Sequence, residues 1–254
     1  MPDVSAFELA WRGGATAARL HRRRPEGDAL PWGTLDMAPA ARDEARSVWS
    51  NGCFTEVASA AAFSGLTTAL LECGAPIDLV AMAADIVVDE LFHTELSARV
   101  TMELGGAVAL DFDMAQIAPV TELGRPIARA AEIAIVTSCV GESLSVPAIA
   151  RSRVLADQPL TRAVLDVLLA DEGPHARLGY WFLDWAREQL TDEERAELSR
   201  IASAAVDAYA PLWRDAPCGC GLDREGREQL AAAVENSIVR PLSRYGICVT
   251  VAAG

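Results

Sequence analysis

The phrase Asp-Glu-x-x-His occurs twice in the sequence, and the two copies contain two of the chain's three histidines. The copies are Asp89-Glu90-Leu91-Phe92-His93 and Asp171-Glu172-Gly173-Pro174-His175. Residues three apart lie on the same face of a helix, so each copy projects a carboxylate and an imidazole together, which is half of a metal site. One such pair could also lie on a solvent-exposed helix face. The flanks DIVVDELF and VLDVLLADE are apolar on both sides, however, and they favour a buried site.

Two single glutamates lie at a depth that matches the two motifs. Glu56 precedes a turn expected near Ala75, and Glu90 follows this turn at a similar separation along the chain. Glu142 and Glu172 are placed in the same way before and after a second expected turn, near Gln158. At about 1.5 Å of helical rise per residue, the members of each pair lie within about one helical turn of each other. Each antiparallel helix pair therefore offers one lone glutamate beside one Glu-x-x-His.

The resulting set has four carboxylates and two imidazoles: Glu56, Glu90, His93, Glu142, Glu172 and His175. This is the ligand set of a dinuclear iron or manganese site inside a helical bundle. Hard oxygen donors with neutral imidazoles suit iron and manganese, and four carboxylates neutralise two divalent ions. Without metal, the converging carboxylates would repel each other and would be costly to desolvate. The sequence therefore predicts two iron ions, with manganese or a mixed Mn/Fe pair as the alternatives.

Four long helices are expected to position these residues. They cover residues 42–72, 76–105, 126–156 and 159–190, and their connections are short, long and short. This order is typical of a four-helix bundle with one end-to-end crossover. We therefore expect an all-α protein with an N-terminal arm at 1–40 that includes a short helix at 4–20, the bundle at 41–190 and a C-terminal helical extension at 191–254. Thr191 and Glu194 would form a capping box, and the last helix would cover residues 224–245.

Several phrases resemble the ferritin-like superfamily of di-iron carboxylate proteins, and in particular bacterial ferritin-like-domain proteins. They are TEVASAAAF, LECGAPIDLV, DELFHTEL, SCVGESLSV and DEGPHARLGYWFLDWA, with a weaker match at VRPLSRYGI. The resemblance covers residues from about 45 to 250 and implies a ferritin-like four-helix bundle. It is specific for the superfamily and does not choose a reaction within it.

The resemblance also implies a role for each residue. One metal would be held by Glu56, Glu90 and His93, and the other by Glu142, Glu172 and His175. Glu90 and Glu172 would be the bridging ligands. Asp89 and Asp171 would accept hydrogen bonds from the opposite histidines and so fix the orientation of the rings. The alternative for these two aspartates is a solvent-facing position.

Two prolines depart from the pattern of ordinary helix formers. Pro174 cannot donate to the carbonyl of Ala170, and it biases Gly173 away from helical angles. We therefore expect the fourth helix to be kinked or bulged at its ligands, which would open a coordination position or enlarge a pocket unless neighbouring packing absorbs it. Pro147 should similarly disturb the third helix, because the carbonyl of Ser143 loses its helical donor.

Cysteines and aromatic residues have less specific roles. Cys53 and Cys139 each lie three residues before a lone glutamate, so they would be either outer groups of the site or small core residues. Phe63, Phe92 and Trp181 would line a pocket or fill the core. His21, beside the three arginines at 22–24, is expected in a solvated arm, and the Cys218-Gly-Cys220 pair has no assigned role.

Composition excludes several functional classes. The net charge is −14, with 36 acidic and 22 basic residues, so a nucleic-acid partner is not expected. All basic residues are arginine, which excludes Schiff-base catalysis and the usual phosphate-loop lysine. Six cysteines are too dilute for a disulfide scaffold, and the N-terminus lacks a signal-peptide pattern. Since no uncharged run reaches the roughly 18 to 20 residues that span a bilayer, we expect a cytoplasmic protein without a membrane partner.

Among the possible functions, we favour a non-haem di-iron oxygenase or oxidase. It would use O2 as co-substrate and an external electron donor to oxidise a small organic substrate. The alternatives are a ferroxidase or iron-handling protein, peroxidase or manganese-catalase-like chemistry, and a metal-stabilised bundle without turnover. Storage ferritins are shorter, and rubrerythrin-type proteins usually carry a cysteine knuckle that is absent here. A homodimer is compatible with the sequence, which identifies no interface.

Overall fold

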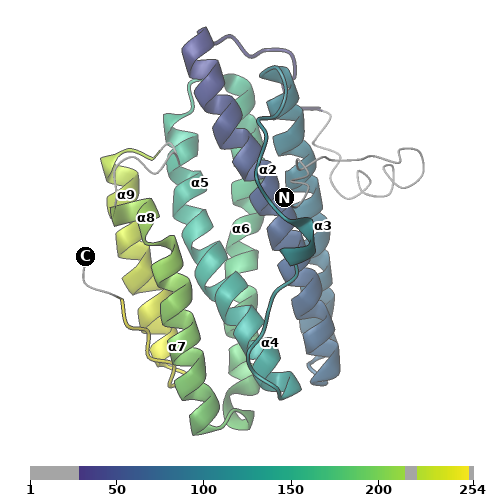
Figure 1. Ribbon diagram of the computed structural model, residues 1–254, viewed down its shortest axis with the longest axis vertical. Coiled ribbons are helices and arrows are strands. Elements are labelled where there is room, and N and C mark those ends of the chain that lie inside the picture. Colours follow the sequence, from purple (N-terminus) through teal and green to yellow (C-terminus); the bar gives the residue numbers. More distant parts are fainter. Residues whose placement is uncertain (1–28, 215–221, 252–254) are drawn as a thin grey trace, which may run out of the picture.

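The structure is a computed structural model that describes residues 29–214 and 222–251. Every regular element in these two ranges is helical. The long elements are α2 (Pro39–Glu72), α3 (Ile77–Glu103), α4 (Pro126–Ala134), the π-helix η3 (Ile135–Glu142), α5 (Ser143–Leu155) and α6 (Pro159–Ala186). Because α4, η3 and α5 follow one another without a break, they form one long segment. Four long segments therefore lie side by side along the molecule (Figure 1).

Local signals in the sequence explain where these helices begin and end. Proline occupies the first turn of α2, α4 and α6, where its missing N–H would have no helical partner. The end of α2 is closed by Gly74, which has a φ of 67°, a conformation that glycine adopts without a Cβ penalty. The N–H of Ala75 donates to the carbonyl of Leu70 at 2.9 Å, and the N–H of Gly74 donates to Leu71 at 3.2 Å. These two bonds form a Schellman motif that reverses the chain into α3.

The long connection between α3 and α4 lies across the helices and is anchored by a buried carboxylate. Glu132 of α4 accepts hydrogen bonds from the backbone N–H groups of Glu122 and Leu123 at 2.9 to 3.0 Å. A short 3₁₀ turn, η2 (Met114–Gln116), lies within this connection. Pro119 packs so closely on α2 that a Cβ added at Gly65 would lie 2.6 Å from its ring. The connection is therefore fixed to α2 and to α4.

The C-terminal part adds helices against one side of these four segments. After the 3₁₀ turn η4 (Arg187–Gln189), the elements are α7 (Asp192–Tyr209), α8 (Pro211–Arg214), α9 (Arg224–Ala233), the π-helix η5 (Val234–Val239) and α10 (Arg240–Ser243). α7 packs on η3 and α4, and α9 packs on α5, as the green and yellow ribbons show (Figure 1). The predicted capping box is present at the start of α7, where Thr191 and Glu194 exchange bonds of 3.2 and 2.9 Å.

Two apolar clusters form the core. Along α3 and α6, one cluster lies before the Glu-x-x-His motif and the other lies after it. On α3 the larger cluster reaches Ile86, and the second cluster begins at Phe92. On α6 the order is reversed, because the second cluster reaches Leu168 and the larger one begins again at Leu178. The Glu-x-x-His motifs therefore lie at the boundary between two apolar layers, where water is excluded from both sides.

Two segments are long and apolar enough to cross a membrane when only length and composition are considered. They are Pro39–Glu72 and Pro126–Leu155, and 28% and 50% of their most apolar windows are buried inside the protein. Helices in the core of a soluble protein pass the same test. The absence of a membrane partner therefore stays a prediction.

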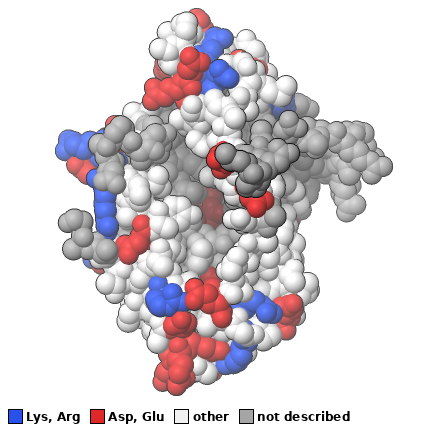
Figure 2. All heavy atoms as spheres, viewed as in Figure 1, with Lys and Arg blue, Asp and Glu red and all other residues white. Residues whose placement is uncertain are grey.

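Charged side chains on one face of the molecule gather toward its two ends, where acidic and basic groups lie next to each other (Figure 2). Four features of the sequence lie outside the described residues: the expected helix at 4–20, His21, the arginines at 22–24 and the Cys218–Cys220 pair.

Candidate metal centre

Six acidic and imidazole side chains from all four long segments converge in the interior. Their ligand atoms form two overlapping groups, and within each group these atoms lie within 4.8 Å of one another. One group is Glu56, Glu90, His93 and Glu172, and the other is Glu90, Glu142, Glu172 and His175. The six residues are those that the motif spacing selected. Glu90 and Glu172 belong to both groups, so the arrangement has two halves that share two carboxylates.

Each histidine turns its Nδ1 atom toward the carboxylates. The Nδ1 of His93 lies 3.6 Å from oxygens of Glu56 and Glu90 and 3.7 Å from Glu172. The Nδ1 of His175 lies 2.9 Å from Glu90 and 3.7 Å from Glu172. The ring centroids of the two histidines are 5.9 Å apart. Both imidazoles therefore aim the same ring nitrogen at the shared carboxylates.

The opposite ring nitrogens contact the aspartates of the two motifs in a crossed pattern. The Nε2 of His93 lies 3.2 Å from Asp171, and the Nε2 of His175 lies 3.4 Å from Asp89. In a neutral imidazole with its proton on Nε2, the aspartate accepts that proton's hydrogen bond and the lone pair of Nδ1 faces the carboxylates. In this neutral form the lone pair of Nδ1 is repelled by the carboxylate oxygens, unless a metal ion or a second proton lies between them.

Several of these inward-facing atoms are buried without a hydrogen bond. Both carboxylate oxygens of Glu90 and the Nδ1 atoms of His93 and His175 have no hydrogen-bond partner among the described residues. The 2.9 Å contact between His175 and Glu90 lacks the geometry of a hydrogen bond. Buried polar atoms are normally paired, and each exception calls for an explanation such as a bound ion. The donor set, its burial and its unpaired atoms together fit a metal ion.

Burial and mutual repulsion change the charge states of the carboxyl groups. Burial is the main reason that the pKa of Glu56 rises to about 8. Burial and then the charge of Glu142 hold the pKa of Glu172 well above its usual value, and the pKa of Glu142 is raised by burial and by Glu90. Glu90 is the exception, because its burial is outweighed by contacts with the two histidines, which lower its pKa. The cluster without metal therefore holds protons that a cation would displace.

The pKa values of the two histidines are raised, whereas burial lowers the pKa of an ordinary base. Burial alone would lower their pKa values, but contacts with carboxylates outweigh it. Asp171, Glu56 and Glu90 raise the pKa of His93 well above its usual value. Asp89 and Glu90 raise the pKa of His175 to about 9. Both imidazoles are therefore protonated near neutral pH when no metal competes for them.

Two serines that the sequence analysis did not select hold the carboxylates in place. Ser59 donates to Glu142 at 2.8 Å. Ser145 lies 2.9 Å from Glu172 and 3.3 Å from Glu142, so its hydroxyl is near both carboxylates. A signal for both was present in the sequence, because each serine follows a candidate glutamate by three residues and so shares its helical face.

The third helical segment widens into the π-helix η3, which ends at Glu142. π-turns add a residue to the backbone and recur at functional sites. The segment then continues as α5 through Pro147, so the irregular turn precedes this proline. In the facing segment, α6 runs without a π or 3₁₀ turn from Pro159 to Ala186. α6 therefore has no bulge of either kind at Pro174, which agrees with the alternative that neighbouring packing absorbs the proline.

The hydroxyl of a serine in η3 forms hydrogen bonds with two backbone groups of α6, at the end of the second motif and one turn beyond it. Ser138 donates to the carbonyl of His175 at 2.5 Å and accepts from the N–H of Gly179 at 2.8 Å. These are the two backbone groups that an ordinary helical turn would pair directly. A Cβ at Gly179 would lie 2.6 Å from the Sγ of Cys139, so the two segments touch here through their smallest residue. This contact fixes the turn of α6 that carries His175.

The remaining candidates of the sequence analysis have structural positions. Cys53 and Cys139 are buried, and neither belongs to the two ligand groups found among the described residues. Burial, followed by the charge of Glu56, raises the pKa of Cys53 to about 12, which disfavours a thiolate. Phe63 and Phe92 are core residues, and the ring of Phe63 lies 6.0 Å from that of His175. Trp181 is 43% exposed and does not fill the core.

Comparison with known proteins adds no assignment, since no protein-family model and no curated protein matches this chain.

Proposed function

We propose that this chain is a ferritin-like di-iron protein that uses O2 to oxidise a small organic substrate. The observation that carries the proposal is the pair of overlapping Glu/His groups, in which the carboxylate oxygens of the shared Glu90 and both Nδ1 atoms are buried without hydrogen bonds to the described residues. The order of the helices supports the ferritin-like part. α2 packs on α3 and α5 packs on α6, and a single long connection joins the two pairs.

The ligand set would be divided between two ions. Glu56 and His93 would serve one ion, Glu142 and His175 would serve the other, and Glu90 and Glu172 would contact both. The ligand atoms are carboxylate oxygens and imidazole nitrogens without thiolate, which supports iron or manganese over softer metals. Two bound iron ions would supply the redox chemistry that reduces O2.

The protein's own side chains prepare this site before any ion binds. When a metal ion displaces the second proton of each histidine, Asp171 and Asp89 would hold the remaining proton on Nε2 and so leave Nδ1 as the ligand atom. Ser59 and Ser145 hold carboxylates on the η3 and α6 side. Apolar clusters on both sides exclude water, which strengthens electrostatic interactions within the site. The substrate and the electron donor are proposals that follow from the reaction class.

The first test is the metal content of the chain. The protein is loaded with Fe(II) without O2, desalted and analysed for iron. We expect about two irons per chain in the wild type, as a dinuclear ligand set predicts. Glu142→Ala and His175→Ala should each lose iron and the colour that develops on exposure to O2. Glu95→Gln is a matched control, because Glu95 is a buried glutamate of α3 that belongs to neither ligand group.

The second test separates the functional classes. For an oxygenase or oxidase, O2 consumption by the loaded protein should depend on an organic substrate and an electron donor. Iron oxidation that continues far beyond two per chain would instead indicate storage. If either variant keeps full iron and full O2 reactivity, the assignment of the six ligands is wrong.

A further inference from the structure

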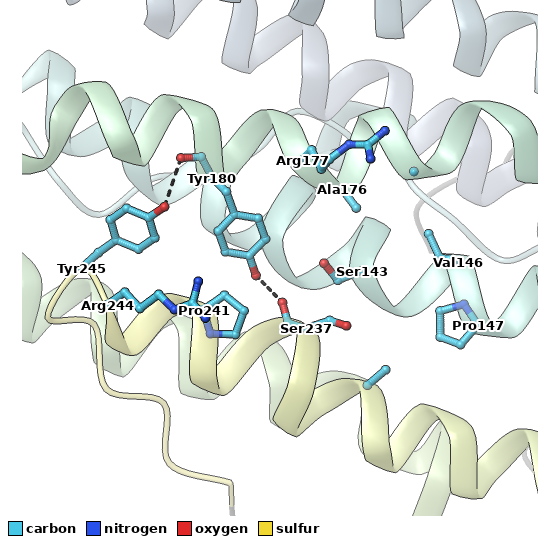
Figure 3. Close-up of a pocket in the computed structure, with 12 residues that line it drawn as sticks. Ser143, Val146, Pro147, Ala176, Arg177, Tyr180, Ser237, Pro241, Arg244 and Tyr245 are labelled. Carbon is cyan, nitrogen blue, oxygen red and sulfur yellow. Dashed lines mark hydrogen bonds between the residues drawn. The ribbon is translucent and has the colours of Figure 1, made fainter.

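A pocket of about 590 Å³ lies between α5, α6 and the C-terminal segment formed by η5 and α10 (Figure 3). This volume is within the range of pockets that bind small molecules. The pocket is separate from the Glu/His cluster, yet it touches the same two segments. Ser143, Gly173 and Ala176 line it, and they are the chain neighbours of Glu142, Glu172 and His175, respectively.

Two arginines from opposite walls give this pocket a positive character. Arg177 belongs to α6, and Arg244 follows α10. Neither guanidinium makes an ion pair with a described residue, although the chain has 36 acidic and 22 basic residues. The guanidinium of Arg177 lies over the ring of Trp181, at 5.9 Å from its centroid. In an acidic protein, two arginines that line one pocket and have no carboxylate partner among the described residues can pair with a ligand anion.

The rest of the lining suits the body of an organic ligand. Val146, Pro147 and Pro241 are apolar, and Tyr180 presents a ring between the two walls (Figure 3). The hydroxyl of Tyr180 is already engaged with the backbone carbonyl of Ser237, so the tyrosine offers its ring rather than its hydroxyl. This bond also ties α6 to η5, which keeps the two walls in a defined position.

We propose that this pocket binds a small organic acid, whose carboxylate is attracted by the positive charges of Arg177 and Arg244 and whose apolar body packs on Tyr180 and the prolines. The proposal goes beyond the proposed function and does not depend on it, because the residues that recognise the acid are not metal ligands. The acid would contact the same segments that carry Glu142, Glu172 and His175.

The test uses the full chain, both as isolated and after treatment with a chelator. Benzoate and hexanoate are titrated in a calorimeter, and benzyl alcohol and hexanol serve as neutral counterparts with the same apolar bodies. Chelation matters because a carboxylate could otherwise bind a metal ion. We expect the two acids to bind both preparations and the alcohols to bind at least tenfold more weakly.

Variants place the binding in this pocket. Arg177→Gln and Arg244→Gln should each weaken the binding of benzoate at least tenfold. Gly173→Leu should block it, because a Cβ at Gly173 would meet only the side chain of Arg177, at 3.8 Å, and the longer side chain would extend into the pocket. Arg153→Gln is the control, since Arg153 pairs with Asp166 outside the pocket. Thermal unfolding of each variant shows that it is folded.

Four results would overturn the proposal. Acids and alcohols that bind equally would exclude recognition of the anion, and so would arginine variants that bind like the control. Binding that disappears after chelation would place the acid on a metal ion instead of in this pocket. Absence of binding by both acids to the wild type would also refute it, whether or not the chain binds iron.

Discussion

Replacing Glu56 with glutamine should stabilise the metal-free protein near neutral pH, although it removes a proposed metal ligand. Burial raises the pKa of Glu56 from 4.5 to about 8. At pH 7 this carboxyl is therefore protonated in the folded protein and ionised in the unfolded chain. The difference of about 2.5 pH units between 4.5 and 7 lowers the stability of the wild type by about 3 to 4 kcal/mol, since each unit corresponds to about 1.4 kcal/mol.

Glutamine has nearly the same shape and does not ionise, so it removes this penalty. The variant also loses the contact with His93, where the two side chains approach to 3.6 Å. That loss costs about 1 kcal/mol, and the expected net gain is about 2 to 3 kcal/mol at pH 7. The folded state binds more protons than the unfolded chain, so this part of the wild type's stability falls as the pH rises from 4.5 to about 8. The advantage of the variant should therefore grow over the same range and then level off.

Urea denaturation of chelator-treated protein at pH 5, 6, 7 and 8, followed by circular dichroism, measures this difference. Glu44→Gln is the control, because Glu44 is exposed on the same helix, and it should change stability by less than about 0.5 kcal/mol. Adding Mn(II) should reverse the order, because the wild type gains binding energy that the variant lacks. A metal-free Glu56→Gln protein that is less stable than the wild type at pH 7, or a difference independent of pH, would refute the reasoning.

Three further predictions concern the supports of the site. Gly179→Ala should lower the free energy of unfolding by about 1 to 3 kcal/mol, because its Cβ would lie 2.6 Å from the Sγ of Cys139; urea denaturation of this variant measures the loss. Glu132→Ala should destabilise the protein by about 2 kcal/mol or more and speed amide exchange in the connection between α3 and α4, because it leaves two backbone N–H groups without their acceptor. Binding of Mn(II) at pH 7 should release at least two protons, because Glu56 and His175 have pKa values of about 8 and 9 and must lose their protons to act as ligands. Calorimetry in buffers of different ionisation enthalpy measures that release, and a heat that does not depend on the buffer would contradict it.

Much of the candidate site was predictable because helical geometry is local. The three-residue spacing of Glu90 and His93, and of Glu172 and His175, places each pair on one face whatever surrounds the helix. Proline and glycine marked the ends of the helices, so a count of residues from each turn was enough to place Glu56 and Glu142 at the right depth. The start of α7 followed from its capping box for the same reason, since the residues that make the bonds are three apart.

The tertiary structure decided the features that depend on two helices at once. The hydroxyl of Ser138 forms hydrogen bonds with the backbone of His175 and Gly179 on another helical segment. No local sequence pattern indicates such bonds. The arginine pocket likewise combines α6 with a segment that follows much later in the chain. The sequence by itself determined which side chains share a helical face, because backbone hydrogen bonds in a helix join residues that are close in the chain. The close approach of the helices determined how those faces meet, because packing depends on the shapes of all the contacting side chains.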